Sequence, residues 1–167
     1  PCETLDFATG TGNFAPTYSF YAQVAEVEVD PETGHIEILN MWTAHDGGQE
    51  LNPMLVRGQI IGSTVMQIGQ TLYEGIIRDD KGETLNTSFR DYKMPTFMDI
   101  PRAQELYSMD IPDTEGPFGA KEAGEGAGTP TIAAIASAIE NAVGIRIRSL
   151  PITPEKIVRA LKEKEGK

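Results

Sequence analysis

The residues with the clearest capacity for chemistry lie in a glycine-rich segment, residues 116–128, that directly precedes an apolar helical pattern. Backbone N–H groups at the start of a helix, together with the positive end of the helix dipole, favour the binding of an anion. The segment is therefore a candidate site for a phosphate or a similar anionic group. A flexible connector is the common alternative for such a composition, and composition alone leaves both interpretations open.

Glu125 is the most informative residue of this segment because it stands between two glycines, Gly124 and Gly126. A carboxylate in this position is either exposed at the tip of a loop or held in a pocket. Desolvation in a pocket would raise its pKa toward that of a useful general base. The sequence thus makes Glu125 a candidate base, with a solvated loop acid as the alternative.

Two nucleotide-binding motifs are excluded at this segment. Gly119 and Gly124 have the spacing of the Walker loop, but Glu125 occupies the position where that loop requires Lys. The glycines of 124–128 also lack the spacing of the dinucleotide fingerprint, and no convincing strand precedes them.

A few polar residues elsewhere could also serve a site. Gln59 and Gln70 are eleven residues apart, about three helical turns, and so project from one face of a predicted helix. They could hydrogen-bond a cofactor, although a polar residue on an apolar helix more often meets solvent or backbone. His45 and Asp46 are poorly suited to act as a catalytic pair, because consecutive side chains of an extended chain point to opposite faces. A turn-forming role is favoured for Asp46.

Composition narrows the class of protein. The 167 residues, 40% of them hydrophobic, suit one domain with a buried core. The net charge of -11 is spread along the chain, so nucleic acid is not an expected partner. The lone Cys2 permits neither an internal disulfide nor an iron–sulfur cluster. Without a visible export signal or a long apolar stretch, we expect a cytoplasmic protein with no membrane span.

A hairpin is predicted near the start of the chain. Apolar residues alternate with acidic ones over 25–30, which is typical of a strand with one buried face. The turn 30–34 places Pro31 where a fixed φ suits a type I turn and Gly34 where a positive φ is needed. A second strand follows over 36–42.

A long helix is predicted over 54–74, after the start signal Leu51-Asn52-Pro53. Apolar residues at helical spacing predict that it is largely buried; they are Met54, Ile61, Val65, Ile68 and Leu72. Gly58, Gly62 and Gly69 interrupt it, which suggests that a neighbouring backbone or a bulky ligand approaches closely.

The second half of the chain predicts a strand over 103–110, a helix over 130–143, a strand over 145–147 and a helix from Pro154. Thr129 is the predicted N-cap of the 130–143 helix and Gly144 its stop. The order of elements predicts an α+β fold in two layers, with a β-hairpin in a small mixed sheet and helices covering one side. Residues 1–17 are expected to form an irregular arm, 18–163 the domain, and 164–167 a frayed tail.

A series of motifs carries a resemblance to a known family. The motifs are Val24 to Asp30 with Thr33-Gly34, His45-Asp46-Gly47, Leu51-Asn52-Pro53, Gly58-Gln59, Asp91 to Thr96, Gly116 to Lys121, Gly124-Glu125 and Leu150 to Lys156. In order and spacing this series resembles the end of the molybdopterin-binding subunit of the xanthine dehydrogenase, aldehyde oxidase and 4-hydroxybenzoyl-CoA reductase family. The resemblance covers about Tyr18 to Leu161.

The resemblance implies specific roles. It makes Glu125 the catalytic base of an oxidative hydroxylation at a molybdenum centre, and it implies that Gln59, Lys121, Ala123 and Gly124 bind the cofactor. No protein ligand to the metal is implied. The implied cofactor is molybdopterin in its cytosine dinucleotide form, shared with partner chains. The implied partners are the rest of the molybdenum subunit, an iron–sulfur subunit and a flavin adenine dinucleotide (FAD) subunit.

Two features separate this chain from typical members. Gly126-Ala127-Gly128 follows the glutamate where xanthine oxidases usually have two prolines, and Lys121-Glu122-Ala123 is closer to the 4-hydroxybenzoyl-CoA reductase branch. The family subunits are several times longer, so we expect this chain to be inactive alone and to complete an enzyme for an aromatic heterocycle, aldehyde or related substrate. The alternative is a non-catalytic assembly or binding module that retains the fold.

Overall fold

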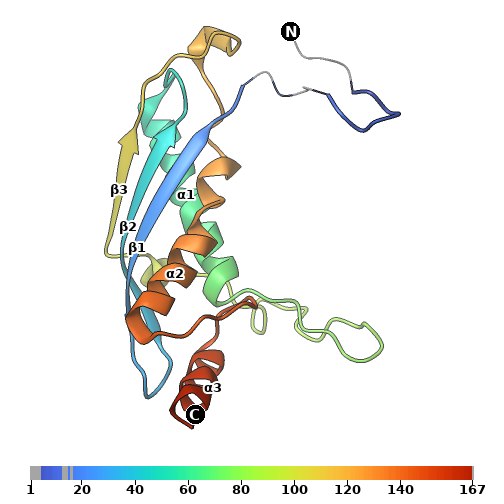
Figure 1. Cartoon of the computed structure of the whole chain (residues 1–167), viewed down its shortest axis with the longest axis vertical. Helices are drawn as coiled ribbons and strands as arrows, with labels where there is room; N and C mark the ends of the chain where they lie inside the picture. The colour runs from blue at the N-terminus through green and yellow to red at the C-terminus, as the bar shows by residue number, and fades with distance from the viewer. Residues whose placement is uncertain (1–4, 13–14, 16, 167) are drawn as a thin grey trace.

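A mixed sheet of three strands, in the order β1-β2-β3, organises the molecule. The computed structural model describes residues 5–12, 15 and 17–166 (Figure 1). β1 (Phe20–Val29) pairs antiparallel with β2 (Ile36–Asp46), and β2 pairs parallel with β3 (Ala103–Ser108). Both the hairpin and the short third strand were predicted from the sequence. The small mixed sheet of the predicted α+β fold is therefore confirmed.

The hairpin turn follows from its residue types. One carboxylate oxygen of Asp30 accepts from the backbone N–H of Glu32 at 2.8 Å, and the other accepts from the Thr33 hydroxyl at 2.7 Å. Gly34 adopts a φ of 75° and donates its N–H to the Asp30 carbonyl. A side chain at Gly34 would collide with the carbonyl oxygen of Pro154, so the turn lies directly against the last helix.

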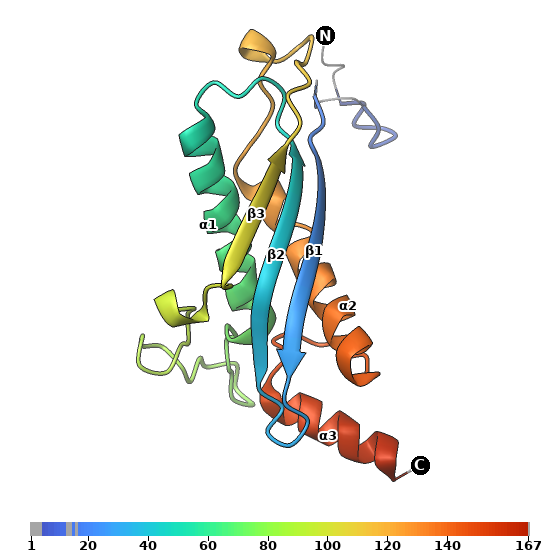
Figure 2. The ribbon, with the colours of Figure 1, turned by 90° about the vertical axis from the view of Figure 1, so that its left-hand side faces the viewer.

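Two helices cover one face of the sheet, as predicted. α1 (Pro53–Leu72) and α2 (Thr131–Val143) lie side by side behind the strands, whereas α3 (Pro154–Glu165) lies across the hairpin end (Figure 2). The side chain of Asn52 caps α1 by accepting from the Leu55 N–H at 3.1 Å. The core between the layers consists of Ile36, Ile38, Met41, Ile68, Leu72, Ile135, Ile139, Ile145, Ile152 and Ile157.

The start of α2 differs from the prediction. Thr129 is not the N-cap, because its backbone is already helical at φ -53° and ψ -45° and closes a 3-10 turn, η3 (Glu125–Gly128). Pro130 takes the cap position without any side-chain cap bond. The glycine-rich segment thus ends in a tight helical turn that continues almost directly into α2.

The predicted strand over 145–147 is wrong. Gly144 ends α2 with a φ of 68° and turns the chain toward α3, and residues 145–147 pair with no strand among the described residues. Ile145 is nevertheless buried in the core. The apolar alternation there reflects packing without strand pairing.

The prediction that α1 is largely buried is also wrong. Met54 is 76% exposed, whereas Ile68 and Leu72 are buried. The buried stripe includes two hydroxyl residues, Thr64 and Thr71, that an apolar pattern omits. Their burial costs little because each hydroxyl donates to the carbonyl one turn earlier. Among the three glycines of the helix, Gly69 is the one with close neighbours in the described part of the chain, namely the side chains of Glu74 and Pro95.

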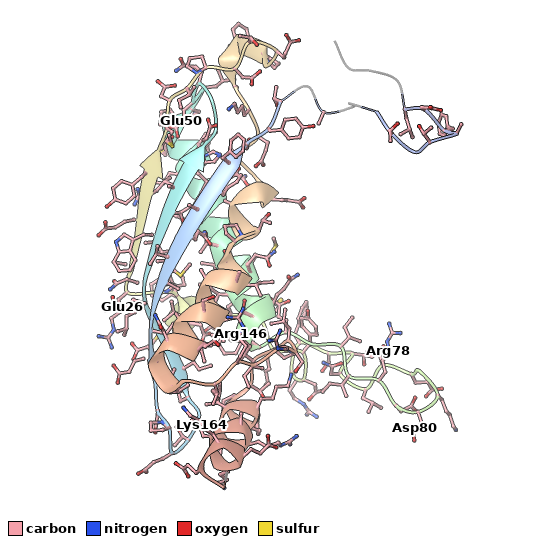
Figure 3. The ribbon with its side chains drawn as sticks, viewed as in Figure 1. Glu26, Glu50, Arg78, Asp80, Arg146 and Lys164 are labelled. Atoms are coloured by element: carbon pink, nitrogen blue, oxygen red, sulfur yellow. The ribbon has the colours of Figure 1, made fainter. Side chains whose placement is uncertain are left out.

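The chain between α1 and β3 is irregular, as predicted, apart from a short 3-10 turn, η1 (Phe97–Asp99). Part of it projects from the body, with Arg78 and Asp80 near its tip (Figure 3). At the other end of the chain, α3 continues to Glu165, and Lys164 donates to the Val143 carbonyl at 3.2 Å. The division into arm, domain and tail stays a prediction.

The collision at Gly34 predicts a large stability difference between two glycines of positive φ. Gly82 has a φ of 85°, but a side chain there would meet only open space, so Gly82→Ala should cost about 1–2 kcal/mol of unfolding free energy from backbone strain alone. Gly34→Ala should cost about 1–3 kcal/mol more, because the methyl group displaces Pro154. Urea unfolding of both variants tests this, and equal costs would contradict the packing of the turn on α3.

Candidate active site

The glycine-rich segment folds back onto the end of β2. Gly48 and Ala120 form a bridge, the Gln49 N–H donates to the Gly119 carbonyl, and the Lys121 N–H donates to the Gly47 carbonyl, both at 2.8 Å. Ser108, the last residue of β3, bonds to Glu50 at the same end of the molecule (Figure 3). The strand ends therefore provide a rigid support for a segment that glycine leaves free to adopt many conformations.

A buried ion pair lies beneath this support. The Lys121 ammonium donates to Asp46 Oδ2 at 2.7 Å, and the two side chains are only 9% and 10% exposed. Asp46 is the last residue of β2, and its shortest contact is this ion pair. The turn contact expected for it is longer: its Oδ1 accepts from the Gly48 N–H at 3.4 Å. Removing either partner would leave the other charge buried and uncompensated, which destabilises the folded state.

An aromatic pair joins β1 to the same segment. The rings of Tyr21 and His45 stack with centroids 4.6 Å apart and an interplanar angle of 17°. His45 is completely buried, and its Nε2 lies 3.1 Å from the Glu122 carbonyl oxygen. Because a carbonyl only accepts, Nε2 carries the proton. The Tyr21 hydroxyl donates to the Glu122 carboxylate.

Glu125 begins η3, immediately beyond these contacts. Its side chain is exposed, and within the described part of the chain its carboxylate has no hydrogen bond or ion pair. The preceding turn is fixed by Glu122, whose Oε2 accepts from the Gly124 N–H at 3.0 Å. Of the two alternatives left by the sequence, the exposed position is the one observed in this chain, yet the backbone that carries it is well anchored.

Gln23 anchors the other end of η3. The two N–H donors of its amide are shared among the Ala127 carbonyl at 3.0 Å and the hydroxyl oxygens of Thr43 and Thr64, and its amide oxygen accepts from Thr131 at 2.6 Å. This one residue of β1 therefore connects β2, α1, η3 and α2. Sequence analysis missed it. Extending the strand alternation back from Ala25 would have placed it on the buried face, where a polar residue signals a hydrogen-bond network.

The predicted cofactor-binding residues divide into two groups. Gly124 faces open space, and Ala123 is half-buried. Gln59 is exposed on α1, one turn before Ser63, whose carbonyl borders Gly128 of η3, so it lies toward the same end as Glu125. Gln70 lies three turns away. Lys121, in contrast, already has its ammonium bound to Asp46 and its N–H bound to Gly47.

Comparison with known proteins decides the family. Residues 2–101 match the molybdopterin cofactor-binding domain family. The chain belongs to this family. It is 39% identical over 147 residues to the 6-hydroxypseudooxynicotine dehydrogenase complex subunit gamma of Paenarthrobacter nicotinovorans, and 40% identical over 157 residues to the probable hypoxanthine oxidase XdhD of Escherichia coli K12. These matches cover 87% and 92% of this molybdopterin cofactor-binding domain.

Solved structures agree with the fold of the domain. The aldehyde oxidoreductase of Desulfovibrio desulfuricans matches 96% of the chain with a TM-score of 0.87 and 33% identity. Quinoline 2-oxidoreductase of Pseudomonas putida 86 matches 82% with a TM-score of 0.78 and 36% identity. The chain spans only 16% to 18% of the length of these four relatives. The predicted family and fold class are confirmed.

Neither a cluster of metal ligands nor a membrane-spanning helix occurs in the part of the chain that the structure describes. No group of three or more His, Cys, Asp or Glu side chains among the described residues could hold a metal ion. None of the helices in that part of the chain has both the length and the apolar character needed to cross a membrane.

The ion pair under the loop predicts an asymmetric response to mutation. Lys121→Met leaves the Asp46 carboxylate buried without its cation and should cost about 3 kcal/mol of unfolding free energy. Adding Asp46→Asn should recover part of that loss. Arg102→Met is the matched control, because the Arg102–Glu37 pair is 69% and 42% exposed and should contribute less than about 1 kcal/mol. Urea unfolding measures all three, and equal costs for Lys121→Met and Arg102→Met would contradict this account.

Proposed function

We propose that this domain is the carboxyl-terminal piece of a molybdenum oxidoreductase subunit and supplies its catalytic base, Glu125. The observation that supports the proposal is an exposed carboxylate, with no bonding partner among the described residues, on a backbone held on both sides. Lys121 and Glu122 anchor the chain before it, and Gln23 anchors the chain after it. A base must be accessible to its reacting partner and must also be held in place.

The exposed residues of the site fit a pterin cofactor. Apart from the adjacent backbone, a side chain at Gly58, Gly62 or Gly124 would meet no atom of the described residues within 4 Å, so a flat group can approach the backbone at these positions. The exposed amide of Gln59 can donate to and accept from such a group. Molybdenum in this proposal is carried by molybdopterin, for which the cytosine dinucleotide form is our expectation, and it needs no ligand from this chain.

The bound cofactor supplies the two-electron oxidation of the substrate, and the chain supplies proton transfer. Glu125 accepts a proton through its carboxylate as the substrate is hydroxylated. The turn 122–125 holds the direction of that carboxylate, since Glu122 fixes the Gly124 N–H. Walls contributed by other segments would exclude water around Glu125, and the resulting desolvation would strengthen it as a base.

The surface of the domain supports a position inside a larger assembly. Several large apolar side chains are more than four-fifths exposed, which is costly in an isolated protein; they are Phe7, Phe89, Phe97, Met98 and Phe118. We propose that they pack against the rest of the molybdenum subunit, and that iron–sulfur and FAD subunits complete electron transfer in the cytoplasm. The substrate class proposed is an aromatic heterocycle, an aldehyde or a related small molecule.

Removing the proposed base tests the assignment. In the assembled enzyme, Glu125→Gln should lower kcat by at least about 10²-fold, because the amide cannot accept the proton. Molybdenum and pterin content should stay at the wild-type level, since the change is isosteric. Glu163→Gln, an exposed glutamate of α3, is the matched control and should leave turnover unchanged. Steady-state kinetics and metal analysis give the result; full activity of Glu125→Gln would favour the non-catalytic assembly module instead.

Gln59 is tested by cofactor content. Gln59→Ala should reduce the pterin retained by the purified complex several-fold, because one exposed hydrogen-bonding amide is lost beside the proposed pocket. Gln70→Ala removes the same group from the same face of α1 three turns away and should retain wild-type pterin. Fluorescence of the oxidised pterin after release measures both. Equal retention in the two variants would exclude a cofactor-binding role for Gln59.

A further inference from the structure

Glu122 is hydrogen-bonded to side chains of β1 and β2 and to the backbone of the turn that bears Glu125. Its carboxylate accepts from the Tyr21 hydroxyl of β1 and, through Oε2, from the Gly124 N–H at 3.0 Å. Its carbonyl accepts from His45 Nε2 at 3.1 Å. No other acidic residue of the loop has this set of contacts in the described structure, and neither the sequence nor the family match assigns it a role.

We propose that Tyr21 and Glu122 act as positioning residues for Glu125, and this proposal rests on the proposed function of Glu125 as the base. Tyr21 holds the Glu122 carboxylate against β1, and Glu122 in turn holds the Gly124 N–H, one residue before Glu125. The direction of the Glu125 side chain is therefore set by a hydrogen-bond relay that starts in the sheet.

The packing around the relay leaves it little freedom. A side chain at Gly126 would collide with Glu122 Oε1 and would lie 2.5 Å from Tyr21 Cε2, so η3 lies directly on the tyrosine and the carboxylate. The stacked His45 ring fixes the plane of the tyrosine ring. The Lys121–Asp46 ion pair fixes the backbone immediately before Glu122. Loss of the Tyr21 hydroxyl would thus release the Glu122 carboxylate from β1 while leaving the aromatic ring in place.

The Tyr21 hydroxyl keeps its proton and can therefore always donate to Glu122. Burial raises the pKa of the Tyr21 phenol far above its usual value, and the hydrogen bond to Glu122 raises that pKa further. The hydroxyl therefore remains a donor throughout the pH range in which the enzyme is assayed. A hydrogen bond from a neutral donor to a carboxylate is stronger than one between neutral groups.

Tyr21→Phe in the assembled enzyme tests the relay. It retains the aromatic stack on His45 and removes only the donor to Glu122. We expect kcat to fall roughly 10- to 100-fold, because small misplacements of a catalytic group have effects of this size. The KM for substrate and the molybdenum content should not change. Amide hydrogen exchange over residues 122–128 should become faster, which turnover alone would not reveal.

Matched variants separate positioning from general destabilisation. Tyr92→Phe removes another phenol that donates to a glutamate, Glu74 at 2.7 Å, in the irregular segment between α1 and β3, and it should leave both kcat and exchange over 122–128 unchanged. Glu122→Ala should reproduce the effects of Tyr21→Phe. Glu122→Gln keeps one carbonyl oxygen as an acceptor and should restore part of kcat relative to Glu122→Ala.

The outcomes distinguish this proposal from the proposed function. Wild-type kcat in Tyr21→Phe and Glu122→Ala would overturn the positioning role, whether or not exchange becomes faster, provided that Glu125→Gln is inactive. Full activity of Glu125→Gln would overturn the base assignment, and with it the catalytic purpose of the relay. Slower turnover combined with faster exchange, confined to Tyr21→Phe and the Glu122 variants, would support both.

Discussion

The closure of the glycine-rich loop on the end of β2 is the constraint on which the rest of the site depends. Glycines allow the backbone to approach neighbouring groups closely but provide no conformational preference of their own. The preference comes from elsewhere: the Lys121–Asp46 ion pair, the backbone bonds of residues 119–121 and the contacts of Glu122. The sheet thus determines where Glu125 lies, although Glu125 does not belong to the sheet.

This arrangement explains how the exposed Glu125 carboxylate can be carried by a backbone of fixed position. Asp46, Lys121 and His45, which lie beneath the loop, are buried or nearly so, and the core isoleucines lie between the same sheet and its covering helices. Gln23 extends the same principle past Glu125, since it donates to acceptors of β2, α1 and η3 and accepts from Thr131 of α2. The domain therefore presents one rigid wall of a site whose other walls, in our proposal, belong to the remainder of the subunit.

Much of the architecture was predictable because it depends on local patterns. The hairpin was recognised from Asp30 to Gly34, and the end of α2 from Gly144, since turn and cap chemistry act within a few residues. The long-range contacts could not be predicted in this way. Asp46 and Lys121 are 75 residues apart, and nothing in the spacing of either residue indicates the other. At 145–147 a local pattern instead predicted a strand that does not form, because burial alone produces the same alternation of apolar residues as strand pairing.

An experimental structure of the assembled enzyme with its cofactor is the most direct test of the central claim. The account predicts that the Glu125 carboxylate lies within hydrogen-bond reach, about 3 Å, of the reacting groups at the molybdenum centre, directly or through one water molecule. It would be contradicted by a Glu125 side chain that points into bulk solvent while the cofactor occupies another face of the domain.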